Sequence, residues 1–100
     1  MIKATRLFLT GSVQGMFFEQ FIKEQADSLT LKGFFRKLED GRVEIFLEGD
    51  HEKLQEMVAI CKRGYQHTHI RNVEEREERL RQTDEQLIPI RAHLESIIVI

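Results

Sequence analysis

The order in which the hydrophobic residues change their spacing constrains the fold of this chain more than any other feature. Alternation with a period of two indicates a strand, and recurrence every three to four residues indicates a helix with one buried face. Strands are expected at 4–10, 31–38, 43–48, 68–75 and 96–100, and helices at 18–30 and 51–63. The resulting β-α-β-β-α-β order is that of the split βαβ, ferredoxin-like fold. We therefore expect an α/β sandwich, with an antiparallel sheet, both helices on one face and a short extra C-terminal edge strand.

Signals at the turns and helix ends support this order. Asp40-Gly41 favours a tight hairpin, because both residue types tolerate the positive φ that such turns require. Asp50 is suited to cap the second helix at its N-terminus, and Gly64 is suited to end it. The apolar residues of that helix form one stripe at helical spacing: Leu54, Met57, Val58 and Cys61. The single cysteine is therefore interpreted as a buried structural thiol.

Composition sets further bounds on the class of protein. One hundred residues, 41% hydrophobic and 32% charged, predict a single domain over 1–100. The formal net charge is -2, so no nucleic-acid partner is expected. The longest apolar run, Ile97–Ile100, is too short to span a membrane, and one cysteine fits a reducing, cytoplasmic location.

Residues 74–93 are expected to form a charged excursion before the last strand. Within it, Glu75 and Arg79, and likewise Glu77 and Arg81, have the i,i+4 spacing that supports an exposed helix. We expect a solvated, salt-bridged surface segment rather than a binding element.

The stretch between the first strand and the first helix reads GSVQGMFFEQF, from Gly11 to Phe21. Gly11 and Gly15 would let the loop curl so that backbone N–H groups converge at the helix N-terminus. Such a nest, together with the helix dipole, attracts anions. Phosphate or another small anion is thus expected at the loop residues Ser12, Val13, Gln14, Gly15, Met16, Phe17 and Phe18.

The same stretch resembles the first acylphosphatase signature, G-x-V-Q-G-V-x-F-R-x-F. The second signature, G-W-V-x-N-x-x-D-G-x-V-E, resembles GFFRKLEDGRVEIFLEG at 33–49. The two motifs are in register, and the resemblance spans most of the chain, most weakly from about 65 to 93. It implies the acylphosphatase fold and a loop that cradles the phosphate of an acyl phosphate. It also implies an arginine at the helix start that binds the phosphate and an asparagine on the second strand that positions the attacking water.

This chain departs from the family pattern at both of those positions, where it carries Glu19 and Lys37. A carboxylate about 4 Å from another negative charge is repelled by roughly 1 kcal/mol in bulk water and about 4 kcal/mol at an effective dielectric of 20. Lysine has no acceptor for the proton of a water molecule. We therefore expect an acylphosphatase-like protein with little or no acyl-phosphate hydrolase activity, serving as an anion- or protein-binding domain.

Two other interpretations stay open. Glu19 and Lys37 are expected to lie close enough to form an ion pair that fills the emptied anion site. Alternatively, Lys37 or Arg36 supplies the missing positive charge, and the chain is a working acylphosphatase with a rearranged site. Phe17 argues against an open cradle, whereas Gly15 argues that the entrance of the cradle survives.

No metal or cofactor is expected. His67 and His69 share one strand face, but no third ligand lies near them in the sequence. An aromatic sheet face would suit a protein partner or a homodimer, although a packed core is the simpler interpretation of its members, Phe34, Phe35 and Phe46.

Overall fold

The computed structural model describes residues 1–65, 68–78 and 97–99. The bounds of the elements, in chain order, are β1 (Ile2–Gly11), α1 (Met16–Ser28), β2 (Lys32–Lys37), β3 (Val43–Asp50), α2 (His51–Arg63), β4 (Ile70–Glu78) and β5 (Ile97–Val99). The five strands form one sheet in the order β4-β1-β3-β2-β5. The pairs β4–β1, β1–β3 and β3–β2 are antiparallel, and β5 pairs with β2 in parallel at the edge of the sheet.

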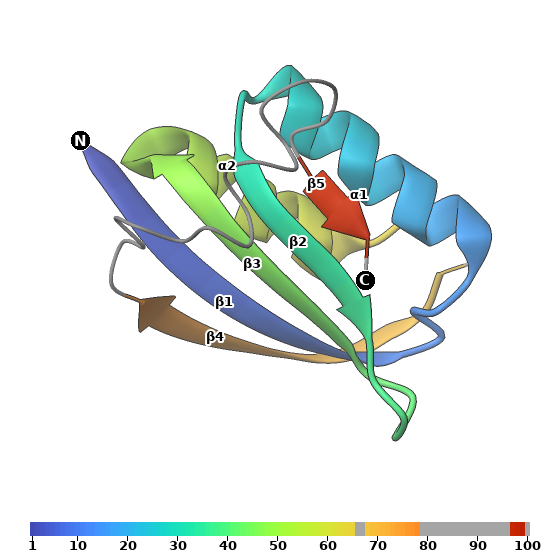
Figure 1. The fold of residues 1–100 in the computed structure, drawn as a ribbon. Helices are drawn as coiled ribbons and strands as arrows, with labels where there is room; N and C mark the ends of the chain where they lie inside the picture. The colour runs from blue at the N-terminus through green and yellow to red at the C-terminus, as the bar shows by residue number, and fades with distance from the viewer. Residues whose placement is uncertain (66–67, 79–96, 100) are drawn as a thin grey trace.

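Both helices lie on the same side of this sheet (Figure 1). The expected ferredoxin-like α/β sandwich is therefore confirmed, including the short C-terminal edge strand.

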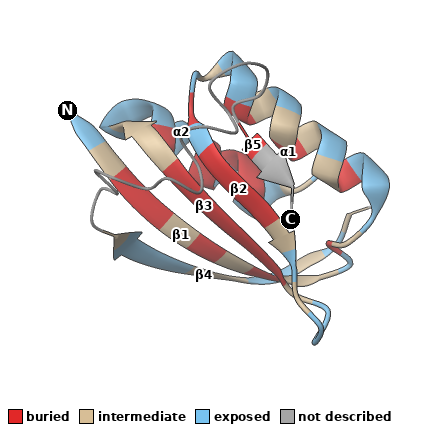
Figure 2. Cartoon of the chain, viewed as in Figure 1, coloured by how far each residue is buried: buried red, intermediate tan, exposed pale blue. Residues whose placement is uncertain are grey.

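The main core lies between the helices and the sheet, where alternate strand residues point inward. Its fully buried members include Leu7 and Leu9 of β1, Phe35 of β2 and Ile45 and Leu47 of β3. The helices contribute Phe18, Ile22, Ala26, Leu54, Met57 and Cys61. Burying each large side chain of this kind stabilises the fold by about 1.5–3 kcal/mol. Figure 2 shows that buried residues concentrate in β1, β2 and β3, whereas β4 at the edge is largely exposed.

The second helix begins and ends where the sequence predicts. The Asp50 carboxylate accepts a hydrogen bond from the Glu52 N–H at 3.1 Å, which satisfies a donor at the helix N-terminus. Gly64 has a φ of 75° and donates its N–H to the Ile60 carbonyl at 3.0 Å. Within this helix, burial raises the pKa of the Cys61 thiol to about 12, in agreement with a structural role.

The fourth strand is longer than the sequence predicts. The strand was expected to end at about Glu75, but β4 continues through residues 76–78, which were expected in the charged excursion, and these residues pair with β1. A backbone ladder and side-chain contacts between elements stabilise this arrangement, since Glu78 pairs with Arg6 of β1 and Glu75 with Lys62 of α2. The remainder of the predicted excursion, 79–93, lies outside the described residues.

Among the described residues, none of the helices has the length and apolar character that crossing a bilayer requires.

Candidate functional site

The loop between β1 and α1 starts at a residue that must be glycine. Gly11 has a φ of 138°, and a Cβ built on it would lie 2.0 Å from the carbonyl oxygen of His69. The next residue, Ser12, donates its N–H to that same oxygen at 2.9 Å. This close approach, at a register shift between β1 and β4, holds the start of the loop against the start of β4.

A second anchor ties the loop to the hairpin between β2 and β3. The side-chain amide of Gln14 donates to the carbonyls of Leu38 and Arg42, at 2.8 and 2.9 Å. Val13, beside it, is fully buried in the core. The loop is therefore positioned from both directions before the helix begins.

The first helix leaves its N-terminus open. Gly15 is the N-cap, and no side chain among the described residues caps the helix. N–H groups of a first helical turn have no partner within the helix, so an uncapped turn offers donors to an anion. Gly15 itself has an ordinary φ of -71° and open space around its Cβ position. The expectation that both glycines permit the curl is thus correct for Gly11 and wrong for Gly15, whose backbone conformation is open to other residues.

A cavity of about 520 Å³ opens over this loop. Its lining residues come from the loop, the start of α1 and the connection between α2 and β4: Ser12, Gln14, Gly15, Phe17, Phe18, Tyr65 and Thr68. Five of the seven belong to the predicted loop, whereas Tyr65 and Thr68 were not predicted. Their only sequence signal is a position just after Gly64, where α2 ends and the chain returns toward the loop.

Two aromatic residues form the rim of the cavity. Phe17 lines the cavity but is 79% exposed, so it does not close the cavity, contrary to the expectation. Tyr65 is 40% exposed and stacks on Phe21 of α1, with ring centroids 4.6 Å apart. This stacking connects the α2–β4 connection to the first helix and fixes one wall of the cavity.

The predicted ion pair between Glu19 and Lys37 is present. Lys37 Nζ, at the end of β2, lies 3.2 Å from Glu19 Oε1 in the first turn of α1. Neither residue is among those that line the cavity. The pair therefore does not fill the open space over the loop, contrary to the prediction.

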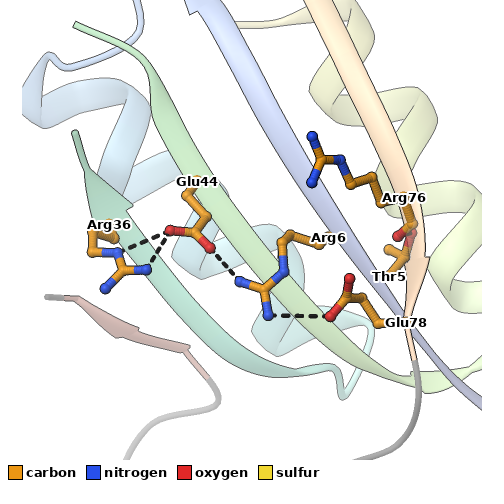
Figure 3. A network of polar contacts seen from close by, with 6 residues as sticks. All are labelled: Thr5, Arg6, Arg36, Glu44, Arg76 and Glu78. Carbon is orange, nitrogen blue, oxygen red and sulfur yellow. Dashed lines mark hydrogen bonds and ion pairs between the residues drawn. The ribbon is translucent and has the colours of Figure 1, made fainter. Parts of the chain in front are cut away.

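Arg36 takes no part in this site, because it belongs to a network on the opposite face of the sheet. Adjacent strand residues point to opposite faces, so Arg36 points away from the side on which Lys37 meets α1. Figure 3 shows the Glu44 carboxylate between Arg36 and Arg6, with Arg6 continuing to Glu78. The Arg36 Nε donates to Glu44 at 2.9 Å. A role for Arg36 as the missing cation is thus excluded in this arrangement.

Glu44 is almost fully buried, and its ionisation depends on the two arginines. Burial alone would raise the pKa of this carboxyl, but hydrogen bonds from Arg36 and Arg6, together with their charges, hold it below its ordinary value. The same face buries Phe34 and Phe46, which stack on each other at 5.6 Å. Phe35 lies in the main core instead, so these three residues form no exposed aromatic face.

The histidine pair provides no metal centre within the described part of the chain. His69 is exposed, and His67 lies outside the described residues. No group of three or more metal-ligating side chains occurs among the residues at 1–65, 68–78 and 97–99.

Comparisons with known proteins agree on one family. The family model described as Acylphosphatase matches residues 5–86. An acylphosphatase from Rubrobacter xylanophilus is 40% identical over 76 residues, covering 76% of this chain and 69% of that protein. An acylphosphatase from Caldanaerobacter subterraneus subsp. tengcongensis is 38% identical over 76 residues, covering 76% and 84%. The crystal structure of acylphosphatase from Bacillus subtilis matches with a TM-score of 0.78 and 27% identity, covering 100% of this chain and 99% of that one.

These relatives overturn one expectation. The substitutions at Glu19 and Lys37 predicted a protein with little or no hydrolase activity, kept as an anion- or protein-binding domain. Several relatives at about 37–40% identity are named acylphosphatase, which favours a working enzyme instead. The two substitutions leave the backbone donors of the loop and of the α1 N-terminus in place, and such donors can bind an anion.

Proposed function

The chain belongs to the acylphosphatase family, and from that premise we propose that it hydrolyses acyl phosphates to a carboxylate and phosphate. The observation that carries this proposal is its similarity, at 37–40% identity, to several acylphosphatases. The uncapped start of α1 below an open cavity of about 520 Å³ supports it, because this is a place where a phosphate can bind.

The chemistry asks little of the protein in covalent terms. Water attacks phosphorus, the P–O bond to the acyl group breaks, and the electron pair of that bond leaves with the carboxylate. Both protons of the water remain on the phosphate, which is released as dihydrogen phosphate. A carboxylate is a weak base and leaves without being protonated. Catalysis of phosphoryl transfer is then largely a matter of positioning and of stabilising charge on the phosphoryl oxygens.

Backbone donors are proposed to hold the phosphoryl oxygens. The loop is fixed by the contacts of Gly11 and Ser12 to His69 and by the two hydrogen bonds of Gln14. Donors that are already oriented cost no reorganisation during the reaction, so rigid anchoring favours this role. The helix dipole adds a partial positive charge at the same point.

Lys37 is proposed to supply the cation that the family arginine supplies elsewhere. It directly precedes Leu38, whose carbonyl holds Gln14, so it lies at the edge of the loop. Its present partner is Glu19, and ion pairs between partly exposed side chains contribute only about 0–1 kcal/mol. A phosphate dianion can therefore compete with Glu19 for the Lys37 ammonium.

The test is hydrolysis of benzoyl phosphate by the purified protein, with inorganic phosphate as inhibitor. We expect turnover above the uncatalysed rate and competitive inhibition by phosphate. Gly15→Leu is the test variant, because a side chain at this position enters the cavity without backbone strain. It should keep the melting temperature and lose the activity. A folded parent without turnover, or equal turnover in the variant, would refute the proposal.

A further inference from the structure

The cavity is larger than a phosphate group requires. At about 520 Å³ it falls within the range of roughly 300–1,000 Å³ typical of sites that enclose a whole small molecule. The loop and the start of α1 contribute only part of the lining. The remainder comes from the α2–β4 connection, through Tyr65 and Thr68. A substrate bound at the loop would therefore have its acyl group inside the same cavity.

Among the described residues, the side chains that line this space are aromatic or uncharged. Phe18 is buried beneath it, and Phe17 and Tyr65 stand exposed at the rim. No Asp, Glu, Lys, Arg or His is among the described residues that line it. An acyl group with a charge of its own would lose water there without gaining an ionic partner, which disfavours its binding.

The exposure of the rim points to a ligand surface. Phe17 lies four residues before Phe21 on α1, so the two share one side of the helix, and Phe21 stacks on Tyr65 at 4.6 Å. Phe21 is partly buried against the core, whereas Phe17 keeps 79% of its surface exposed. An apolar acyl group that covered Phe17 and Tyr65 would remove this apolar surface from water.

From this arrangement we infer that the preferred substrates are acyl phosphates with an uncharged aromatic or bulky apolar acyl group, selected by Phe17 and Tyr65. The inference rests on the proposed function, because it assigns the acyl end of that same site. Phe17 and Tyr65 act as specificity-determining residues, while the phosphate is bound by the loop.

The experiment compares kcat/KM for benzoyl phosphate, acetyl phosphate and succinyl phosphate, each relative to its uncatalysed rate. We expect benzoyl phosphate to exceed acetyl phosphate by about tenfold or more, and succinyl phosphate, with its free carboxylate, to be the poorest. Phe17→Ala and Tyr65→Ala should each reduce the benzoyl-to-acetyl ratio severalfold, mainly through KM. Ile2→Ala is the control, because Ile2 is also apolar and 57% exposed but does not line the cavity, so the ratio should not change.

The outcomes separate the two proposals. Hydrolysis of all three substrates without preference, or a ratio that Phe17→Ala and Tyr65→Ala leave unchanged, overturns the assignment of the acyl group and leaves the hydrolase function standing. Hydrolysis of none of the three by the folded protein overturns both.

Discussion

Lys37 and Glu19 form an ion pair, with Nζ 3.2 Å from Oε1, across the junction between the end of β2 and the start of α1. The two residues occupy the positions at which the family resemblance implies an asparagine and an arginine. The family pattern has a positive charge at the helix start and a neutral amide on the strand. In this chain the helix start carries a negative charge and the strand carries the positive charge. The consequences of this arrangement can be tested one residue at a time.

Removal of the Lys37 charge should weaken turnover. Lys37→Met should lower kcat/KM for benzoyl phosphate about 10- to 150-fold, since a charged hydrogen bond contributes about 1.5–3 kcal/mol and each 1.36 kcal/mol is a factor of ten. Lys37→Arg should retain most of the activity, because it keeps a cation at that position. Lys37 is 39% exposed, so neither change should alter the melting temperature greatly. Full activity in Lys37→Met would show that backbone donors suffice without it.

Removal of the Glu19 charge should improve phosphate binding. Glu19→Gln releases Lys37 and removes a repulsion of roughly 1 kcal/mol, so the inhibition constant of inorganic phosphate should fall about fivefold. The effect should fade as salt is added, because screening weakens exposed charges. Glu24→Gln, an exposed acid further along α1, serves as the control and should leave the constant unchanged. A weaker phosphate affinity in Glu19→Gln would mean that the carboxylate assists the site.

The two glycines of the loop should differ sharply in their tolerance of a methyl group. Gly11→Ala places a Cβ 2.0 Å from the His69 carbonyl at a φ of 138° and should destabilise the protein by at least about 1–3 kcal/mol. For a domain of this length that corresponds to a fall in melting temperature of about 4–8 °C for each kcal/mol. Gly15→Ala meets nothing within 4 Å and should melt with the parent. Thermal unfolding of the two variants checks this directly, and equal melting temperatures would refute the strained contact at Gly11.

Glu44 should make stability depend on pH in acid. Its pKa is held below the ordinary value in the folded state, so the carboxylate binds fewer protons there than in the unfolded chain. Its contribution is therefore fully present above the unfolded pKa of about 4.3 and is lost as pH falls through the lower, folded pKa. Urea unfolding at pH 7 should show Glu44→Gln to be less stable by roughly 2–4 kcal/mol, since Arg6 and Arg36 lose their charged partner.

The gap between the parent and Glu44→Gln should then narrow as the pH is lowered below about 4. A gap of constant size down to pH 2 would show that the carboxylate is not the ionised partner of the two arginines. Glu56→Gln, at an exposed position in the middle of α2, provides a control whose stability should follow that of the parent at each pH.

Much of the fold could be predicted because its signals are local. The Asp50 cap, the Gly64 stop and the apolar stripe of α2 depend on neighbours within one or two turns, and all three occur in the structure. The charged residues at 74–78 show the limit of such signals. The i,i+4 spacing of Glu75 to Arg79 and of Glu77 to Arg81 suits a helix. Pairing with β1 and contacts to Arg6 and Lys62 nevertheless place residues 74–78 in a strand.

The site shows the same division. The sequence alone determined the loop at 12–18, its place before a helix and the substituted charges at Glu19 and Lys37, since motif and spacing are properties of consecutive residues. Tertiary structure alone decided that Tyr65 and Thr68 complete the cavity and that Phe17 stands at its rim. The pairing of Lys37 with Glu19 was predicted from the family resemblance, but only the tertiary structure decided that Arg36 binds Glu44 on the far face. Such contacts join segments that are distant along the chain. Strand order, register and helix placement bring these segments together, and no local sequence pattern encodes that arrangement.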